Sequence, residues 1–114
     1  MKTLKYYTYH QNNSGGRYDV GPVMAPIMIV QAHDCEEANH LAQRIGLYWD
    51  GVAMGMDCEC CGDRWTPQWG EHHAAPEPAI WGSTDLEKWS VRRHDREPQV
   101  YVRVFDWSGD IHEF

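Results

Sequence analysis

The feature that most limits the fold is a stretch of 36 residues, 47–82, that contains five glycines and three prolines. Glycine loses more backbone entropy on folding than other residues, and proline cannot donate a backbone hydrogen bond, so both interrupt helices and strands. About a third of the 114-residue chain is therefore expected to form loops and short extended pieces. Regular structure must come from the flanking segments, while three of the four cysteines fall inside this stretch.

The segment before this stretch predicts one amphipathic helix, over residues 35–45. Apolar side chains recur there at the i, i+3, i+4 and i+7 spacing of a single helix face, at Ala38, Leu41, Ala42 and Ile45. Asp34 can accept hydrogen bonds from the first free backbone N–H groups, and Glu37 lies where a capping-box partner belongs. Gly46 is suited to end the helix.

Three segments predict strands. Aromatic residues and threonine favour a strand within residues 3–10, and the apolar run IMIVQA after Pro26 favours a second. Near the C-terminus, QVYVRVFDW alternates valines with other side chains, which is the pattern of a half-buried strand. Ser108 and Gly109 then predict a turn, after which DIHEF returns as the partner strand of a β-hairpin.

A second, short helix over about residues 85–93 is predicted by Thr84 and Glu87, which have capping-box spacing. The elements together predict a single α+β domain, residues 1–114, with a small, mainly antiparallel sheet and one or two packed helices. Leu, Ile, Val and Phe number only 19, but six Trp, six Tyr and five Met can supply the core. Each buried aromatic side chain covers roughly 150–250 Å².

Charge and hydropathy limit the compartment and the partners. The net charge is −7 and no basic stripe is present, so direct binding to a nucleic-acid backbone is not expected. The N-terminal MKTLKYYTYHQ lacks the apolar core of a signal peptide, and the longest apolar run, MAPIMIV, is too short to cross a membrane. We therefore expect an intracellular protein without membrane attachment, whose cysteines are reduced.

The segment MDCECCGDRW, residues 56–65, is a candidate zinc site. Cys58 and Cys61 have CxxC spacing, and two thiolates about 2.3 Å from one zinc ion need a tight turn between them. Gly62 follows directly and allows such a turn, and Cys60 is a candidate third ligand. A fourth ligand would have to come from elsewhere in the chain, and the candidates are His10, His33, Cys35 and the pair His72–His73.

Two other interpretations of the cysteine segment stay open. A redox CxxC usually begins a helix, whose N-terminus lowers the thiol pKa, and the following Gly-Asp-Arg-Trp-Thr-Pro is a poor helix opening. Alternatively the loop packs small, buried thiols as compact apolar groups. In that case Arg64 is a candidate ion-pair partner for Asp57 or Asp63, and Trp65 anchors the loop to the core.

The polar stretch HQNNSGG, residues 10–16, is the second unusual feature. Asparagine side chains and glycine-backed N–H groups could hold an anion such as a nucleotide phosphate, although the lysine and spacing of a P-loop are missing. The plainer interpretation is a strand end followed by a turn. If His10 approaches the cysteine segment, the two stretches form one site, and its candidate ligand- or partner-binding residues are His10, Gln11, Asn12, Asn13, Arg64 and Trp65.

The pairing of YTYHQNNSGG with IGLYWDG and DCECCGDRW resembles small uncharacterised proteins encoded by tailed bacteriophages. The resemblance covers roughly the first 65 residues, including the helix between the two motifs. It implies a phage accessory protein made in the cytoplasm of the infected bacterial host. It carries over no catalytic residue.

The leading hypothesis is therefore an accessory protein that binds a host or phage macromolecule, most readily a protein, with a candidate structural zinc site. The six tryptophans motivate it, because exposed aromatic residues are favoured interface anchors. One alternative is a counter-defence protein that captures a nucleotide or another small ligand. A second is a small metal- or thiol-dependent enzyme, which is less favoured because the serines lack a nucleophile-elbow pattern and no carboxylate pair can be singled out.

Overall fold

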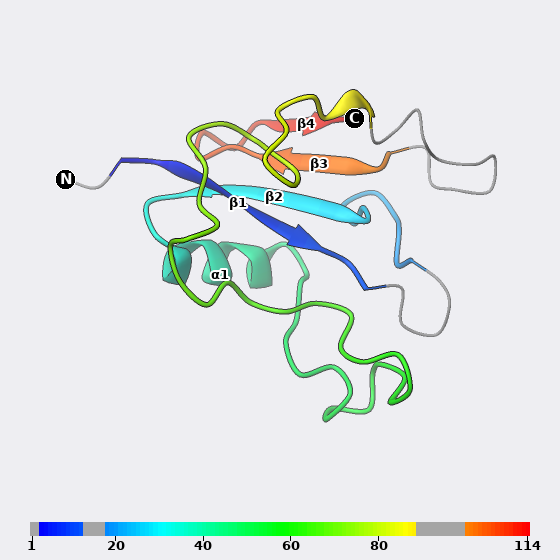
Figure 1. Cartoon of the computed structure of the whole chain (residues 1–114). Coiled ribbons are helices and arrows are strands. Elements are labelled where there is room, and N and C mark those ends of the chain that lie inside the picture. The colour runs from blue at the N-terminus through cyan, green and yellow to red at the C-terminus, as the bar shows by residue number, and fades with distance from the viewer. Residues whose placement is uncertain (1–2, 13–17, 89–99) are drawn as a thin grey trace.

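The computed structural model describes residues 3–12, 18–88 and 100–114. Its elements, in chain order, are β1 (Lys5–His10), β2 (Ile27–Ala32), α1 (Cys35–Arg44), β3 (Val102–Phe105) and β4 (Ile111–Glu113). The strands form one sheet in the order β1-β2-β3-β4, with α1 lying along one face (Figure 1). The predicted α+β class is confirmed.

The sheet is mixed, so the expectation of a mainly antiparallel sheet needs correction. β1 pairs antiparallel with β2 and β3 antiparallel with β4, but the central pair, β2 and β3, is parallel. The long connection through α1 and residues 47–82 brings the chain back to the end of the sheet where β2 began, and parallel neighbours need such a crossover. The C-terminal hairpin is confirmed, and Gly109 occupies its turn with φ +96°.

The helix has the caps that the sequence predicts. The Asp34 carboxylate accepts the Glu37 N–H at 2.8 Å, while the Glu37 carboxylate accepts the His33 N–H, one residue before the cap. At the other end, Gly46 has φ +115° and donates to Gln43 O, and the next N–H, that of Leu47, donates to Ala42 O. These two bonds form a Schellman motif. They end α1 at Arg44, one residue before the predicted boundary.

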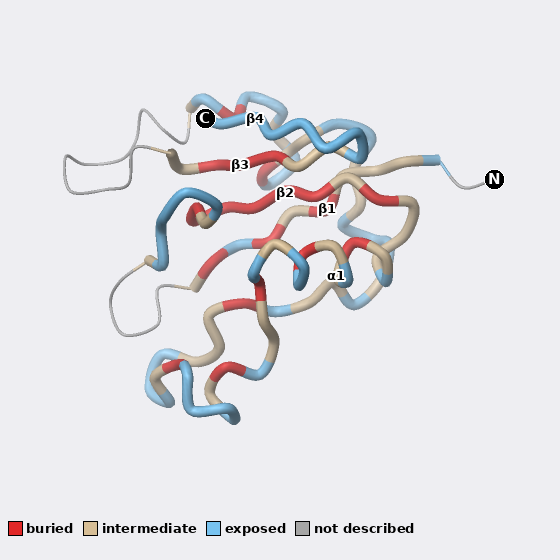
Figure 2. Tube along the Cα trace, turned by 180° about the vertical axis from the view of Figure 1, so that it is seen from behind, coloured by how far each residue is buried: buried red, intermediate tan, exposed pale blue. Residues whose placement is uncertain are grey.

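Both faces of the sheet are covered by apolar side chains. The helix side packs Tyr7, Tyr9, Met28 and Val30 with Ala38, Ala42, Leu47 and Trp65. The other side packs Ile27, Ile29, Val102 and Val104 with Ile80 and Leu86 of the segment after residue 75. The two central strands are accordingly the most buried part of the trace (Figure 2). The unbroken apolar run of β2 is thus explained by burial on both faces.

The remaining segments follow the sequence in part. Residues 47–82 contain no helix or ladder strand, as the glycines and prolines predict, and only isolated bridges join Tyr6 to Ala75 and Ile80 to Ser83. Of the predicted second helix, residues 87–88 have helical geometry and residues 89–93 lie outside the described part of the chain. Within the described ranges, no helix combines the length and apolar character needed to cross a membrane.

Candidate functional site

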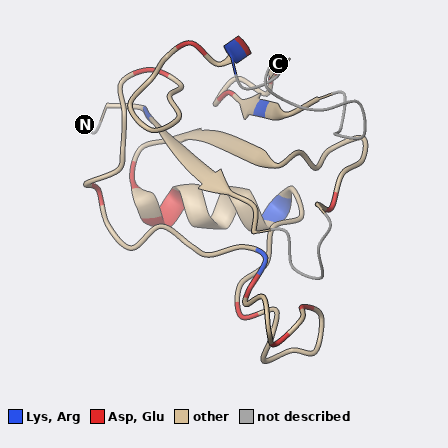
Figure 3. Cartoon of the chain, turned by 45° about the vertical axis from the view of Figure 1, so that its right-hand side comes forward, with Lys and Arg blue, Asp and Glu red and all other residues tan. Residues whose placement is uncertain are grey.

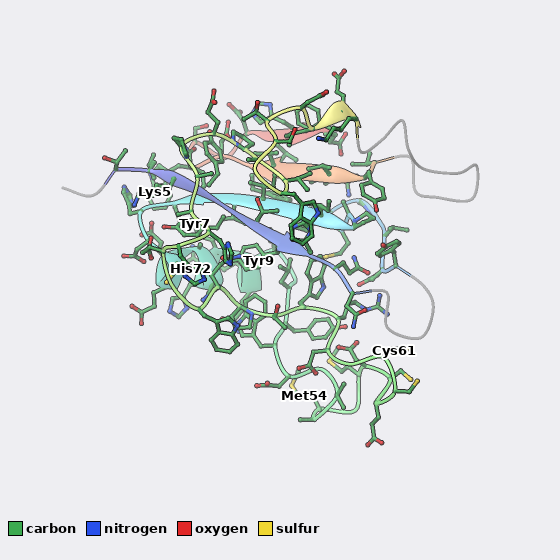
Figure 4. All side chains as sticks on the ribbon, in the orientation of Figure 1. Lys5, Tyr7, Tyr9, Met54, Cys61 and His72 are labelled. Carbon is green, nitrogen blue, oxygen red and sulfur yellow. The ribbon has the colours of Figure 1, made fainter. Side chains whose placement is uncertain are left out.

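Three of the four cysteines, Cys58, Cys60 and Cys61, lie on a loop that projects from the helix side of the molecule. We call residues 48–64 the cysteine lobe; in Figure 1 this segment extends away from the sheet beyond the end of α1. Met54 and Cys61 lie toward its outer end (Figure 4), and both side chains are exposed. The lobe therefore presents sulfur to solvent while its base meets the core through Trp65, which is 1% exposed.

A buried carboxylate organises the inside of the lobe. The Asp57 side chain has no solvent exposure, and it accepts hydrogen bonds from Tyr48 Oη at 2.9 Å and from the Arg64 N–H at 2.8 Å. The Arg64 guanidinium Nε lies 3.6 Å from it, so the predicted Arg64–Asp57 ion pair is confirmed. A buried charge is tolerated only with such partners. Gly51 makes the space, because a Cβ there would lie 1.8 Å from Asp57 Oδ2.

Gln11 links the N-terminal motif to the lobe. Its side-chain oxygen accepts from Arg64 Nη1 at 2.8 Å and from the Asp19 N–H. Its side-chain nitrogen donates to Asp19 O at 3.0 Å and to Ala25 O at 3.2 Å. A glutamine amide offers two donors and two acceptor positions, so these four bonds use its full capacity. Gln11 is buried and holds Arg64 in place.

Asn12 clamps the cysteine turn directly. Its Nδ2 donates to Cys61 O at 2.6 Å and to Asp63 O at 3.2 Å, and its backbone N–H donates to Arg64 O at 2.8 Å. The two motifs singled out in the sequence therefore form one structural unit. Asn13, also a predicted site residue, lies outside the described residues.

The turn that follows Cys58 gathers three sulfur atoms. Cys58 O accepts the N–H groups of Cys61 at 3.2 Å and Gly62 at 3.0 Å, and Gly62 has φ +90°, which favours glycine. The Sγ atoms of Cys58 and Cys60 are 2.8 Å apart, those of Cys60 and Cys61 are 3.6 Å apart, and all three lie within 4.8 Å of one another. These three cysteines could hold a metal ion, and no other such group is found among the described residues.

The sulfur positions are close to those of a thiolate metal centre. Around a tetrahedral ion with metal–sulfur bonds of about 2.3 Å, neighbouring sulfurs lie about 3.8 Å apart. The Cys60–Cys61 separation of 3.6 Å already fits, and the Cys58–Cys60 pair at 2.8 Å needs to open by about 1 Å. Cys60 and Cys61 are exposed, so their side chains have room to make this adjustment.

Hydrogen bonds to sulfur prepare the cluster for a cation. The Cys60 thiol and the backbone N–H groups of Cys60 and Cys61 stabilise the thiolate of Cys58 and hold its pKa below the usual range. The pKa of Cys60 is raised to about 11, first because it donates to Cys58 and then because of Cys61. An arriving metal ion therefore finds a favoured thiolate at Cys58 and has to displace the proton of Cys60.

The structure also tests the redox and the buried-thiol interpretations of the cysteine segment. No helix begins within the lobe, so the helix N-terminus typical of a redox CxxC is missing there. The thiols of Cys60 and Cys61 are exposed, so the interpretation as buried, packed sulfur is wrong for these two residues. Its other part holds, because Trp65 is buried and joins the main core.

The predicted fourth ligands do not join the three sulfurs within the described residues. The His10 ring stacks on Trp81 with centroids 4.5 Å apart, and burial lowers the pKa of His10. His33 Nδ1 lies 2.8 Å from the Glu37 carboxylate. The backbone N–H of Cys35 donates to Glu71, and His72 and His73 pack ring against ring. Among the described residues, the cluster therefore offers three protein ligands and no fourth.

The conformation of one exposed residue, Trp81, is not indicated by the sequence. Trp81 has φ +51°, in the left-handed region, and its side chain is 77% exposed. It occupies a two-residue turn with Gly82, closed by reciprocal hydrogen bonds of 2.9 Å between Ile80 and Ser83. Gly82 marked a turn, but nothing in the sequence marked a tryptophan in this strained conformation. Asp57 was predicted only as a candidate ion-pair partner of Arg64, and nothing in the sequence marked Tyr48 as its second hydrogen-bond donor.

Comparison with curated proteins found no significant match, and neither did comparison with solved structures. A family model described as "Domain of unknown function (DUF7296)" matches residues 4–114. The matched range contains the sheet, the helix, the cysteine lobe and the stretch after residue 10 that clamps it. The chain therefore belongs to the DUF7296 family.

Proposed function

We propose that this chain is a phage accessory protein that binds a host or phage protein in the cytoplasm of the infected bacterium. In this proposal the cysteine lobe is a zinc knuckle that the protein presents to its partner. The observation that carries the proposal is the convergence of three thiols on an exposed loop whose base is fixed by buried hydrogen bonds. A fixed base and an exposed tip are what a recognition element needs.

Zinc is the metal that the donor set favours in a reducing compartment. Thiolate ligands suit zinc, and a CxxC turn followed by glycine is typical of structural zinc sites. Structural zinc is normally four-coordinate. Three sulfurs therefore leave one position for water or for a donor atom of the partner, which would couple metal loading to binding.

The surface supports protein binding rather than capture of a nucleotide. Gln11, a candidate phosphate ligand, already makes four hydrogen bonds within the protein and offers none to an anion. Large apolar side chains are exposed instead: Trp69 is 82% exposed, Met54 56% and Met56 61%. Tryptophan and methionine are enriched in protein interfaces.

The open fourth position also favours a second candidate, a small metal-dependent enzyme. Catalytic zinc sites have three protein ligands and one water, which is the ligand count of this cluster. Hydrolysis by a metal-bound water also uses a positioned acid or base. No carboxylate or histidine joins the three sulfurs among the described residues, so binding remains the better-supported function.

The first test is the metal content of untagged protein, measured by elemental analysis together with thiol counting. We expect about one zinc per chain, three protected thiols and one reactive thiol, that of Cys35. Single substitutions Cys58→Ser, Cys60→Ser and Cys61→Ser should lower the zinc content, and Cys35→Ser is the matched control that should retain it. Metal-free protein with four reactive thiols, or equal loss in the control, would contradict the zinc knuckle.

The second test addresses the partner. Wild-type protein, the Cys35→Ser control and a Cys60→Ser/Cys61→Ser double variant are used as bait in lysates of phage-infected and uninfected bacteria, and enriched proteins are purified for titration. We expect a partner whose affinity is kept by the control and reduced about tenfold or more in the double variant. A partner bound equally by all three baits would show that the lobe is not the recognition element. The lack of any partner would contradict the binding function itself.

A further inference from the structure

The helix-side face of the sheet is covered over only part of its width. α1 packs on β2, and the core beneath it takes two tyrosines from β1. Beside α1, toward β3 and β4, lies an open groove of about 700 Å³. Its apolar lining comes from the sheet, the helix end, the hairpin turn and the segment before β2, and includes Val23, Val30, Leu41, Ile45, Phe105, Trp107 and Ile111. We call it the apolar groove.

Half of the apolar stripe of the helix, which consists of Ala38, Leu41, Ala42 and Ile45, forms one wall of the apolar groove. The two alanines of the stripe are buried against the sheet, whereas Leu41 and Ile45 are only half-buried and line the groove. Opposite them, Trp107 is 46% exposed and Ile111 is 54% exposed. Contiguous exposed apolar surface of this kind marks interaction sites in soluble proteins. The groove is therefore a second candidate interface, on a different part of the fold from the cysteine lobe.

Negative charge predominates in and beside the apolar groove, although Arg44 also lines it. Asp106 and Asp110 line it on the side of the hairpin. A neighbouring hollow of about 950 Å³ shares its helix wall and adds Asp34, Glu36 and Glu37. Figure 3 shows this acidic group at the start of α1. Counted over the described residues, the two linings together contain five carboxylates and one arginine, Arg44.

We propose that the apolar groove is the docking site for an amphipathic helix of a partner protein, with an apolar face and flanks rich in Lys and Arg. A helix fits this place because α1 already forms one wall, and packed helices lie side by side at about 8–10 Å. Insertion of an apolar helix face into such a groove is a recurrent mode of recognition. The acidic rim favours basic flanks and repels acidic ones.

This inference rests on the proposed function only in making the chain a protein-binding module, because it uses a separate surface. No residue of the cysteine lobe lines the groove. It also gives a role to the parts of Leu41 and Ile45 that remain exposed, because both side chains pack against the core with only part of their surface. The partner is thereby defined chemically, as a basic amphipathic helix.

The probe is a pair of synthetic peptides of equal length, with Leu at i, i+3, i+4 and i+7 and either Lys or Glu at the remaining positions. The full-length protein is titrated with each peptide, and binding is followed by fluorescence anisotropy and by NMR shifts. We expect the Lys/Leu peptide to shift the signals of Leu41, Ile45, Trp107 and Ile111, and to bind more weakly as salt rises. The Glu/Leu peptide should bind at least about tenfold more weakly than the Lys/Leu peptide.

Variants separate the groove from the rest of the surface. Ile111→Ser should weaken the Lys/Leu peptide by about tenfold, whereas Trp69→Ser, at an even more exposed position outside the groove, should leave its affinity unchanged. The Cys60→Ser/Cys61→Ser variant should also bind normally, so failure of the zinc knuckle leaves this result intact. Equal affinity for the two peptides, shifts at other residues, or no binding would each overturn the proposal. So would a dimer that Ile111→Ser dissociates, because a second copy would then be the occupant.

Discussion

The buried carboxylate of the cysteine lobe depends on one glycine. A Cβ at Gly51 would meet Asp57 Oδ2 at 1.8 Å and Tyr48 Cε2 at 2.8 Å, so alanine must displace the side chain that fixes Arg64. Overpacking costs about 1–3 kcal/mol, and disturbing a buried ion pair adds to it. We expect Gly51→Ala to lower the free energy of unfolding by at least about 2 kcal/mol in denaturant titrations.

The matched control is Gly21→Ala. Nothing lies within 4 Å of a Cβ at that position, so its effect should stay within about 0.5 kcal/mol. If the two alanine variants proved equally stable, the lobe would be able to rearrange around Asp57, and the fixed base assumed for the recognition element would be lost.

The second prediction at the scale of the residue concerns His10 and pH. Partial burial lowers the pKa of His10 below its ordinary 6.5, and the His10 ring stacks on that of Trp81. Between the lowered value and 6.5 the unfolded chain holds more protons than the folded one, so stability falls as the pH drops through this window. Trp81→Gly, which suits the left-handed turn, should raise the pKa of His10 toward 6.5 in an NMR titration.

Trp69→Gly tests whether the stacking partner matters. Trp69 is 82% exposed and has no ring contact with His10 among the described residues, so its removal should leave the His10 titration unchanged. An unchanged titration in Trp81→Gly as well would mean that the sheet, and not the indole, desolvates His10.

At the scale of the element, β3 depends on a buried arginine. Arg103 is 6% exposed; its Nε donates to Glu113 of β4 at 2.8 Å, and its Nη1 donates to Gly21 O at 2.6 Å and Met24 O at 2.9 Å. Arg103→Leu leaves these acceptors without their donor. We expect a loss of about 2–4 kcal/mol in the free energy of unfolding.

Glu113→Gln makes a graded comparison, because the Glu113 side chain is 50% exposed. A pair with one solvated partner contributes up to about 1 kcal/mol, and added salt should reduce that contribution. In denaturant titrations, the free energy of unfolding of Arg103→Leu should therefore be well below that of Glu113→Gln. Equal losses would show that the ion pair, rather than the buried carbonyl contacts, accounts for the role of Arg103.

Periodicity and capping were sufficient to predict the elements, but not how the strands pair. The i, i+3, i+4 stripe and Asp34 located α1, and the alternation after residue 99 located β3. Alternation has the same period in parallel and antiparallel strands, so it could not reveal that β3 runs parallel to β2. The available signal was the unbroken apolar run of β2, which is typical of a strand buried between two layers.

The candidate site was predictable where it is local in the sequence and not where it is remote. The three cysteines and Gly62 lie within one turn, and their spacing was enough to predict that the sulfurs meet. The clamps come from far away, since Gln11 binds Arg64 across 53 positions and Asn12 binds Cys61 across 49. Such hydrogen bonds exist only after the chain has folded, so Gln11 and Asn12 were predicted as binding residues instead of supports.

At the scale of the whole molecule, the cysteine lobe lies outside the two packed layers. The buried residues of the two core clusters come from the sheet, from α1 and from the segments that cover the sheet. Trp65, directly after the lobe, anchors the chain in the helix-side cluster. The lobe is also tied to the body at its start, where Tyr48 and Trp49 pack against the helix-side core, and through the bonds of Gln11 and Asn12. Segments with few buried apolar contacts open locally at lower free energy than the core. Loss of the lobe need not unfold the sheet.

Metal removal should therefore separate the two parts. Binding of zinc by thiolates contributes directly to the folding of the segment that supplies them, and here all three ligands come from the lobe. In hydrogen exchange after chelation of zinc, we expect residues 51–63 to lose protection while β2 and β3 keep it, and the Cys35→Ser control should behave like the wild type. Loss of protection in β2 would instead mean that the lobe and the sheet unfold as one cooperative unit. The whole fold would then depend on the bound metal. The apolar groove, which is built on the sheet and α1, would form only in the metal-loaded protein.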